Sequence, residues 1–152
     1  MKDESAISKM TSASQICATK IFTFAAAHKI PGHKGKCKCL HGHTYKLEVS
    51  VRQNTKNGVY GNSSGISSAG MVIDFKDLSS LVNGLIIEKL DHVYLNDLFA
   101  FIPTTEQLGT WIFTELNKAL AHPTEITKIR LWESDSSFVT IKAGEDYIER
   151  VL

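Results

Sequence analysis

Two histidines spaced two residues apart are the first residues here whose types suggest chemistry. His41 and His43 flank Gly42. On an extended strand, side chains two residues apart point to the same face, so both imidazoles can reach one metal ion. His28 ends the preceding apolar segment and can join them if the two segments pair as strands. Three neutral nitrogen ligands with a free fourth position are typical of a catalytic zinc site, which acidifies a bound hydroxyl or water.

Two cysteines lie just before the histidine pair, and they leave undecided which residues are the third ligand and the general base. Cys39 has the same strand parity as His41 and His43, so it is a rival third ligand that would give a sulfur-containing site. A thiolate is also a possible general base, and strand parity alone offers both Cys37 and Cys39 for that role. The chain has three cysteines, an odd number that argues against a closed disulfide framework and favours a reducing compartment.

The bulk properties of the chain exclude several classes of protein. A length of 152 residues fits one domain, and 17 basic against 16 acidic side chains argue against a nucleic-acid-binding protein with a basic surface. No apolar run approaches the roughly 20 residues that span a bilayer, and the polar N-terminus lacks the apolar core of a signal peptide. We therefore expect a cytoplasmic protein without a membrane or nucleic-acid partner. We expect residues 1–17 to form a flexible tail and residues 18–152 a single domain.

The first half of the chain reads as strands and loops that would position the histidines. Residues 18–28 are apolar and aromatic, and residues 44–53 alternate between apolar and polar, as in a half-buried strand. Between them, residues 30–40 are rich in Gly and Lys and predict a loop. Residues 54–70 predict a long turn or insertion, followed by a short strand at 71–74 that would form an antiparallel hairpin with 44–53.

The second half predicts two helices and two more strands. Apolar residues at helical spacing, from Leu78 to Ile86, form one stripe. Thr104 and Gln107 have the spacing of a capping box and predict a second helix that ends before Pro123. Strands are expected at 126–132 and 138–141. This order predicts an α+β fold, with helices on one face of an antiparallel sheet. The other face needs a partner, so we expect self-association.

Several short motifs, taken together and in this order, resemble the family of 6-pyruvoyltetrahydropterin and 6-carboxytetrahydropterin synthases. The motifs are Phe24 to His28, Cys37 to His43, Gly70 to Phe75, Leu90 to His92, Pro103 to Glu106, and Trp132 with Glu133. The resemblance covers residues 18–142. It implies a tunnelling fold, in which each subunit supplies a four-stranded antiparallel sheet with two helices on one face. Three subunits then close a barrel, and two trimers stack into a homohexamer with active sites between subunits.

The resemblance also implies a substrate, 7,8-dihydroneopterin triphosphate, and a set of site residues. The implied set comprises the Zn²⁺ ligands His28, His41 and His43, the catalytic residues Cys37, Asp91 and His92, and the pterin-binding residues Glu133, Thr105 and Glu106. Spacing within the motif favours Cys37 over Cys39 as the catalytic thiol. Lys34, Lys36 and Lys38 flank Cys37, and our hypothesis is that they favour its thiolate and hold the triphosphate.

Two activities share this set of residues. The stretch from Leu90 to Asp97 and the motif Pro103 to Glu106 resemble bacterial enzymes that form 6-carboxytetrahydropterin, acetaldehyde and triphosphate on the route to queuosine and other deazaguanines. The run from Glu133 to Ser137 is closer to the pyruvoyl-forming enzymes. We expect the carboxy-forming reaction, with the pyruvoyl-forming lyase as the alternative. A third alternative is an inactive, zinc-stabilised binding module, which would need neither Cys37 nor the Asp91–His92 pair.

Overall fold

A computed structural model describes residues 16–53 and 71–144. Nearly all of the predicted N-terminal tail and all of the predicted turn or insertion at 54–70 lie outside the described residues. Among the described residues, no helix is long and apolar enough to cross a membrane.

A five-stranded sheet in the order β3-β1-β2-β4-β5 forms the centre of the fold. Its strands are β1 (Ala18–His28), β2 (His41–Gln53), β3 (Val93–Tyr94), β4 (Thr124–Ser134) and β5 (Ser137–Lys142). The four long strands pair antiparallel, which confirms the predicted sheet. The sequence did not predict β3, a two-residue strand that runs parallel to β1 beside Ala26 and Ala27.

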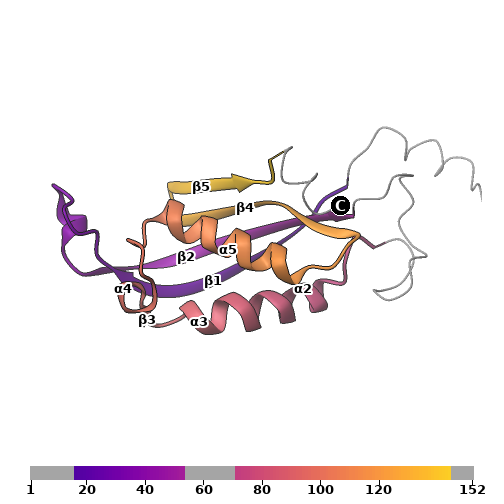
Figure 1. Ribbon diagram of the computed structural model, residues 1–152, viewed down its shortest axis with the longest axis horizontal. Coiled ribbons are helices and arrows are strands. Elements are labelled where there is room, and N and C mark those ends of the chain that lie inside the picture. Colours follow the sequence, from indigo (N-terminus) through magenta and orange to yellow (C-terminus); the bar gives the residue numbers. More distant parts are fainter. Residues whose placement is uncertain (1–15, 54–70, 145–152) are drawn as a thin grey trace, which may run out of the picture.

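Two helical segments cover one face of this sheet, as predicted (Figure 1). The first consists of α2 (Phe75–Val82), a π-helical turn η2 (Asn83–Ile87) and α3 (Glu88–Leu90), which follow one another without a break, and the second is α5 (Thr105–Ala119). The capping residue of α5 is the predicted one, because the Thr104 hydroxyl accepts a hydrogen bond from the backbone N–H of Gln107 at 3.3 Å. Two short helical turns complete the structure, η1 (Lys36–Lys38) and α4 (Leu95–Leu98).

The π-helical turn keeps one apolar stripe facing the sheet. The fully buried residues of the first helical segment are Leu78, Val82, Ile86 and Leu90, which recur every four residues. A regular α-helix advances about 100° per residue, so this spacing would drift by about 40° at each step. The wider π turn at Asn83–Ile87 offsets this drift.

The predicted strand at residues 71–74 is wrong. Asp74 caps α2 instead, since its carboxylate accepts a hydrogen bond from the backbone N–H of Lys76 at 2.7 Å. The segment therefore leads directly into a helix. Its carbonyls at Met71 and Val72 accept hydrogen bonds from the Gln53 side chain, which replaces the backbone pairing of the expected hairpin.

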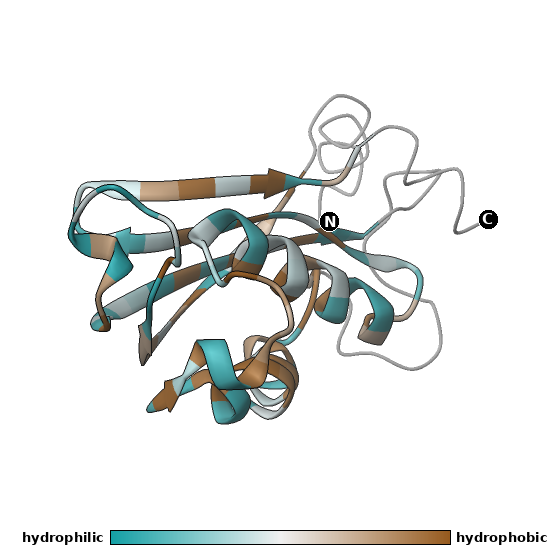
Figure 2. Ribbon diagram, turned by 60° about the vertical axis from the view of Figure 1, so that its left-hand side comes forward, coloured by the Kyte–Doolittle hydropathy of each residue, from teal (hydrophilic) through white to brown (hydrophobic). Residues whose placement is uncertain are grey.

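The core lies between the sheet and the two helical segments. Alternate residues of β2, from Tyr45 to Val51, are fully buried on the helical side, and the alternation is visible as bands along the strands in Figure 2. The helix α5 approaches β5 closely at Gly109, where an added Cβ would lie 2.5 Å from the Ile141 side chain. We call the helical side of the sheet the inner face, and the opposite side the outer face.

Candidate metal centre and active site

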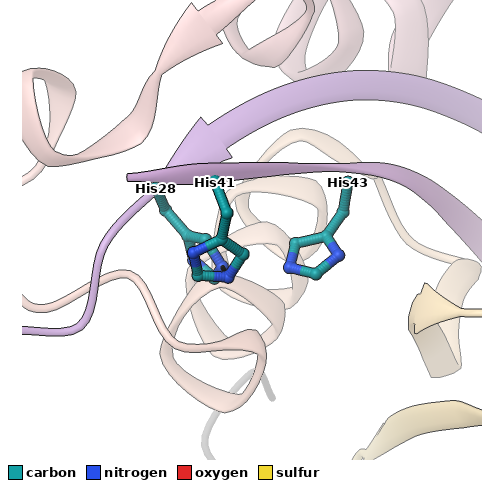
Figure 3. Close-up of side chains that lie close together, drawn as sticks. All are labelled: His28, His41 and His43. Atoms are coloured by element: carbon teal, nitrogen blue, oxygen red, sulfur yellow. Dashed lines mark hydrogen bonds between the residues drawn. The ribbon is translucent and has the colours of Figure 1, made fainter. Parts of the chain in front are cut away.

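Three histidines converge at one end of the inner face. His28, the last residue of β1, pairs with His41, the first residue of β2, and His43 lies two residues further along the same strand. Their side chains all point to the helical side of the paired strands (Figure 3). One nitrogen from each ring can be chosen so that all three lie within 4.8 Å of one another. The structure thus brings together the three predicted metal ligands.

Two backbone carbonyls fix the orientation of these rings. His28 Nδ1 lies 2.8 Å from the carbonyl oxygen of Pro103, and His41 Nδ1 lies 2.8 Å from that of Cys39. A carbonyl can only accept, so each Nδ1 carries a hydrogen, and in a neutral ring Nε2 then presents a lone pair. This is the usual arrangement for a histidine that ligates a metal through Nε2.

The histidine nitrogens and a neighbouring carboxylate lie so close together that a positive charge is needed between them. His28 Nε2 and His41 Nε2 are 3.1 Å apart, and Glu133 Oε1 lies 3.6 Å from Nε2 of both His28 and His43. Unprotonated nitrogens and a carboxylate repel one another unless a proton or a cation lies between them. His43 Nε2 is buried and has no hydrogen-bond partner among the described residues.

Burial favours the neutral form of the third histidine. Burial lowers the pKa of His43, the carboxylate of Glu133 opposes this, and the neighbouring His28 and His41 lower the pKa further. A neutral imidazole is the form that ligates metal. Three nitrogen donors of this kind, two of them held by carbonyls, fit a zinc ion with an open position.

The two neighbouring cysteines differ in their surroundings. Cys39 is exposed and contributes its carbonyl to His41; its thiol is not among the groups that cluster around the metal position. The strand begins at His41, so the parity argument for Cys39 does not extend to it. Cys37 is half-buried within the turn η1, and its carbonyl accepts a hydrogen bond from Ile30 N at 2.8 Å. The loop that carries it projects beyond the end of the sheet (Figure 1).

Asp91 and His92 lie at the edge of the sheet and are anchored to β1. Asp91 Oδ1 accepts a hydrogen bond from the N–H of Ala25 at 2.8 Å, and the N–H of His92 donates to the Ala25 carbonyl at 2.6 Å. The other carboxylate oxygen of Asp91 lies 2.9 Å from Nδ1 of His92. These hydrogen bonds, chiefly the one from Ala25 and then that from His92, hold the pKa of Asp91 below its ordinary value.

The His92 side chain borders a cavity near the outer face. His92 is 81% exposed and has a φ of 58°, an uncommon left-handed conformation that turns the chain from α3 into β3. The cavity measures about 560 Å³. Its lining residues are Ala25, Ala26, Ala27, Gly42, His43, Thr44, His92, Val93 and Tyr94. Ala25 and Ala27 alternate with the buried Phe24, Ala26 and His28, so the side chains beside His92 point away from the metal ligands.

Comparison with known proteins shows which family the chain belongs to. The family of 6-pyruvoyl tetrahydropterin synthases matches residues 17–144. The chain belongs to this family. A 6-carboxy-5,6,7,8-tetrahydropterin synthase from Haemophilus influenzae is 36% identical, over 79% of this chain and 94% of that protein. One from Synechocystis is 41% identical, over 66% of this chain and 74% of that protein. The structure of 6-pyruvoyl tetrahydropterin synthase from Caenorhabditis elegans has a TM-score of 0.66 at 21% identity, covering 86% of this chain and 97% of that one.

The structural likeness confirms the predicted fold class, and the chain has the tunnelling fold of the pterin synthase family. The remaining site residues predicted for this family occupy different positions around the metal ligands. Glu133 lies directly beside them, as described above. Thr105 is buried at the start of α5, two residues after the Pro103 carbonyl that holds His28, whereas Glu106 is exposed.

Several groups that shape this pterin synthase site were missed by sequence reasoning. The carbonyls of Pro103 and Cys39 carry no side-chain signal. Asn96 exchanges two hydrogen bonds with the backbone of Lys29, its Oδ1 accepting and its Nδ2 donating, both at 2.9 Å. Nothing in its local sequence marks it as an anchor for the start of the cysteine loop. Tyr45 did have a signal, because it continues the alternation of His41 and His43 onto the same face.

Proposed function

We propose that this protein is a zinc-dependent 6-carboxytetrahydropterin synthase, which converts 7,8-dihydroneopterin triphosphate to 6-carboxytetrahydropterin, acetaldehyde and triphosphate. The observation that carries the proposal is the convergence of three histidine nitrogens and one carboxylate on a single point. The bacterial relatives at 36% and 41% identity support the carboxy-forming reaction, since both bear that name. We place this reaction in the cytoplasm, on the route to queuosine and other deazaguanines.

His28, His41 and His43 hold the zinc ion. When bound, zinc supplies Lewis-acid stabilisation of negative charge on the substrate's side-chain oxygens. Glu133 receives the paired N–H donors on the guanidine-like edge of the pterin ring, because an ionised carboxylate accepts two parallel hydrogen bonds. Thr105 and Glu106, at the start of α5, contact the ring from the side of Pro103.

Proton transfer is assigned to Cys37, Asp91 and His92. Cys37 acts as the base that removes a proton from the hydroxyl-bearing carbon next to the ring, and His92, held by Asp91, returns protons to the side chain. Within one chain the Asp91–His92 pair is anchored at the sheet edge, with His92 bordering a cavity near the outer face. We propose that it serves the metal centre of another subunit.

The edges of the sheet support assembly into a barrel. Among the described residues, β5 pairs only with β4. Beyond β2, β1 pairs with a strand only at Ala26 and Ala27 and is hydrogen-bonded to Asp91 and His92 at Ala25. Each chain thus presents two edges with backbone groups free to extend the sheet. We propose that these edges join three subunits into a barrel and that two barrels form a homohexamer.

The lysines of the cysteine loop are assigned to the triphosphate. Lys34, Lys36 and Lys38 are exposed on either side of Cys37. A flexible cluster of ammonium groups suits a mobile polyphosphate better than one fixed site would. Replacing all three with Gln should raise KM for the triphosphate substrate while leaving zinc content unchanged.

Product identification tests the proposed reaction. The zinc-loaded protein is incubated with 7,8-dihydroneopterin triphosphate, and acetaldehyde and the pterin product are measured. We expect acetaldehyde and 6-carboxytetrahydropterin from the wild type, none from Cys37→Ala, and near-normal amounts from the neighbouring Cys39→Ser. Formation of 6-pyruvoyltetrahydropterin without acetaldehyde would establish the alternative lyase, and no turnover at all would favour a zinc-stabilised binding module.

A further inference from the structure

Asn96 is a polar residue, outside the predicted site, that contacts the start of the loop carrying Cys37. It lies half-buried in the short helical turn α4 and exchanges two hydrogen bonds with the backbone of Lys29. Lys29 follows the last residue of β1 and begins the cysteine loop, residues 29–40, which leads to β2. The proposed chemistry assigns no role to Asn96, although it holds the first residue of this loop.

The contact between Asn96 and Lys29 continues the pairing of β1 with β3. These strands run parallel in a register that pairs Ala26 with Val93, an offset of 67 positions (93 − 26). The same offset joins Lys29 to Asn96. After β3 the backbone turns into α4 and no longer follows β1. The Asn96 side chain therefore supplies the hydrogen bonds that the next backbone group of a longer strand would have made.

A carboxamide suits this position because it resembles a peptide group. It offers one oxygen that accepts hydrogen bonds and an NH₂ group that donates them. Here Oδ1 of Asn96 accepts from the N–H of Lys29 and Nδ2 donates to the Lys29 carbonyl, both at 2.9 Å. An aspartate of the same shape would keep the acceptor but would place its second oxygen against this carbonyl, where two acceptors repel. The paired contact thus requires the amide.

The segment that carries Asn96 is itself fixed, so it can serve as an anchor. The N–H of His92 donates to the Ala25 carbonyl at 2.6 Å, at the beginning of the stretch that runs beside β1. Leu95, the neighbour of Asn96, is fully buried in the core. Asn96 therefore holds the loop against a part of the chain that is bonded to the sheet and packed beneath it.

One further hydrogen bond connects the anchored residue to Cys37. Ile30, which follows Lys29, donates its N–H to the Cys37 carbonyl at 2.8 Å and closes the base of the loop. Cys37 lies in the turn η1, where it is half-buried. Two adjacent residues thus link the Asn96 amide to the backbone of Cys37, first through Lys29 and then through Ile30.

We propose that Asn96 is a positioning residue for the Cys37 thiol, acting through the backbone of Lys29 and Ile30. A general base must lie within hydrogen-bond reach of the proton that it removes, and a misplacement of about 1 Å can cost about 100-fold in rate. The inference rests on the proposed function for the role of Cys37 as that base. The anchoring of the loop by Asn96 does not depend on turnover.

Hydrogen–deuterium exchange, followed by mass spectrometry, tests the anchor. Asn96→Asp and Asn96→Ala are compared with the wild type, all loaded with zinc. We expect peptides covering residues 29–40 to exchange about fivefold faster in Asn96→Asp, as for the loss of one hydrogen bond, and faster still in Asn96→Ala. Peptides from the centre of β2 should be unchanged. Asp97→Asn makes the reverse change at the exposed next residue, and this matched control should exchange like the wild type.

Kinetics with 7,8-dihydroneopterin triphosphate test whether the anchor positions the thiol. We expect Asn96→Asp to lower kcat about tenfold and Asn96→Ala by up to about 100-fold. KM should rise less than about threefold, because the flexible lysines of the loop can still reach the triphosphate. In a Cys37→Ala background, Asn96→Asp should change the residual kcat less than about twofold, since a positioning residue has no effect once its target is gone.

Stability and metal content separate this role from a merely structural one. Zinc content should stay at the wild-type level, because strand pairing with His41 and the Pro103 carbonyl hold His28 independently of Asn96. Both hydrogen bonds of Asn96 are accessible to solvent, so Tm should fall by less than about 3 °C in Asn96→Asp. A structural asparagine would lower Tm without the dependence of kcat on Cys37.

Any of three results would overturn the proposal. Unchanged exchange of residues 29–40 in Asn96→Ala would show that the loop is held without this side chain. Faster exchange with an unaltered kcat would make the contact structural only. Loss of zinc from Asn96→Asp would show that the residue acts on the metal centre instead. If the wild type shows no turnover, the proposed function fails together with the role of Cys37, and the exchange experiment still decides whether Asn96 anchors the loop.

Discussion

The two groups of proposed active-site residues differ in how completely one chain builds them. The metal centre is assembled by residues of a single chain on the inner face, where His28 is fully buried and carbonyls orient two of the three rings. The Asp91–His92 pair is anchored just as firmly, through Ala25, yet His92 is 81% exposed and borders a cavity near the outer face. The three histidines are brought together within one chain, whereas the His92 imidazole is open to groups outside the chain.

This difference follows from strand geometry. Inner-face residues of β1 and β2 point to the helical side, and His28 is buried beside the loop before α5, where it contacts the Pro103 carbonyl. The Asp91–His92 pair instead follows α3 and meets the free edge of β1. A side chain at a sheet edge becomes part of an enclosed site only when something adds to that edge. The predictions below test whether the metal centre is self-contained and whether the pair at the edge works across subunits.

The largest effect is expected from removing a metal ligand. His41→Ala should abolish zinc binding and lower kcat/KM by more than about 100-fold, because even the outer partners of zinc ligands are worth 10–100-fold. Metal content by mass spectrometry and activity with added zinc check this. His33→Ala, in the exposed loop before the cysteines, is the matched control and should keep its zinc. A His41→Ala protein with full zinc content would contradict the three-histidine site.

The next effect separates the metal centre from the base. Cys37→Ala should lower kcat by roughly 10²–10⁴, the usual contribution of a positioned general base, without loss of zinc. Cys39→Ser should retain both activity and zinc, because this residue contacts His41 through its carbonyl, which the substitution keeps. Loss of zinc from Cys39→Ser would instead restore the thiol as a ligand.

Much of this site could be predicted from the sequence, for reasons visible in particular residues. Alternation along β2 placed His41 and His43 on one face, and the same alternation ran on into the core. Strand pairing then brought His28 opposite His41. The alternation of side chains along a strand repeats every two residues, so it can be recognised in a single sequence.

Other features depended on contacts that a local pattern does not contain. The strand predicted at 71–74 failed because a carboxylate at Asp74 capped a helix, which outweighed the extended preference of the neighbouring apolar residues. The carbonyls of Pro103 and Cys39 gained a role only through the fold, since every residue has a carbonyl. Likewise, His43 and Glu133 are 90 positions apart (133 − 43), and only the fold brings their side chains within 3.6 Å of each other.

A subunit-mixing experiment tests whether the edge pair acts in another subunit. Cys37→Ala and His92→Ala should each be nearly inactive alone. If the two residues act in a site formed by two chains, unfolding and refolding an equal mixture should restore about one wild-type site in four, since each residue is intact in half the chains. Activity of the refolded mixture against each variant refolded alone checks this. A mixture no more active than its parts would place both residues in one chain.

The smallest effect concerns the charge of the Asp91 carboxylate. Its pKa is lowered chiefly by the N–H of Ala25 and then by His92, so the folded state favours the ionised form. A group with a depressed folded pKa stabilises the protein above its unfolded pKa, about 3.9 for Asp, and this contribution is lost as pH falls through the folded value. Carboxyl NMR should show Asp91 titrating below 3.9. In His92→Ala most of the depression should persist, because the Ala25 hydrogen bond is the larger cause; a return to the ordinary value would make His92 the main partner and loosen the proposed anchor to β1.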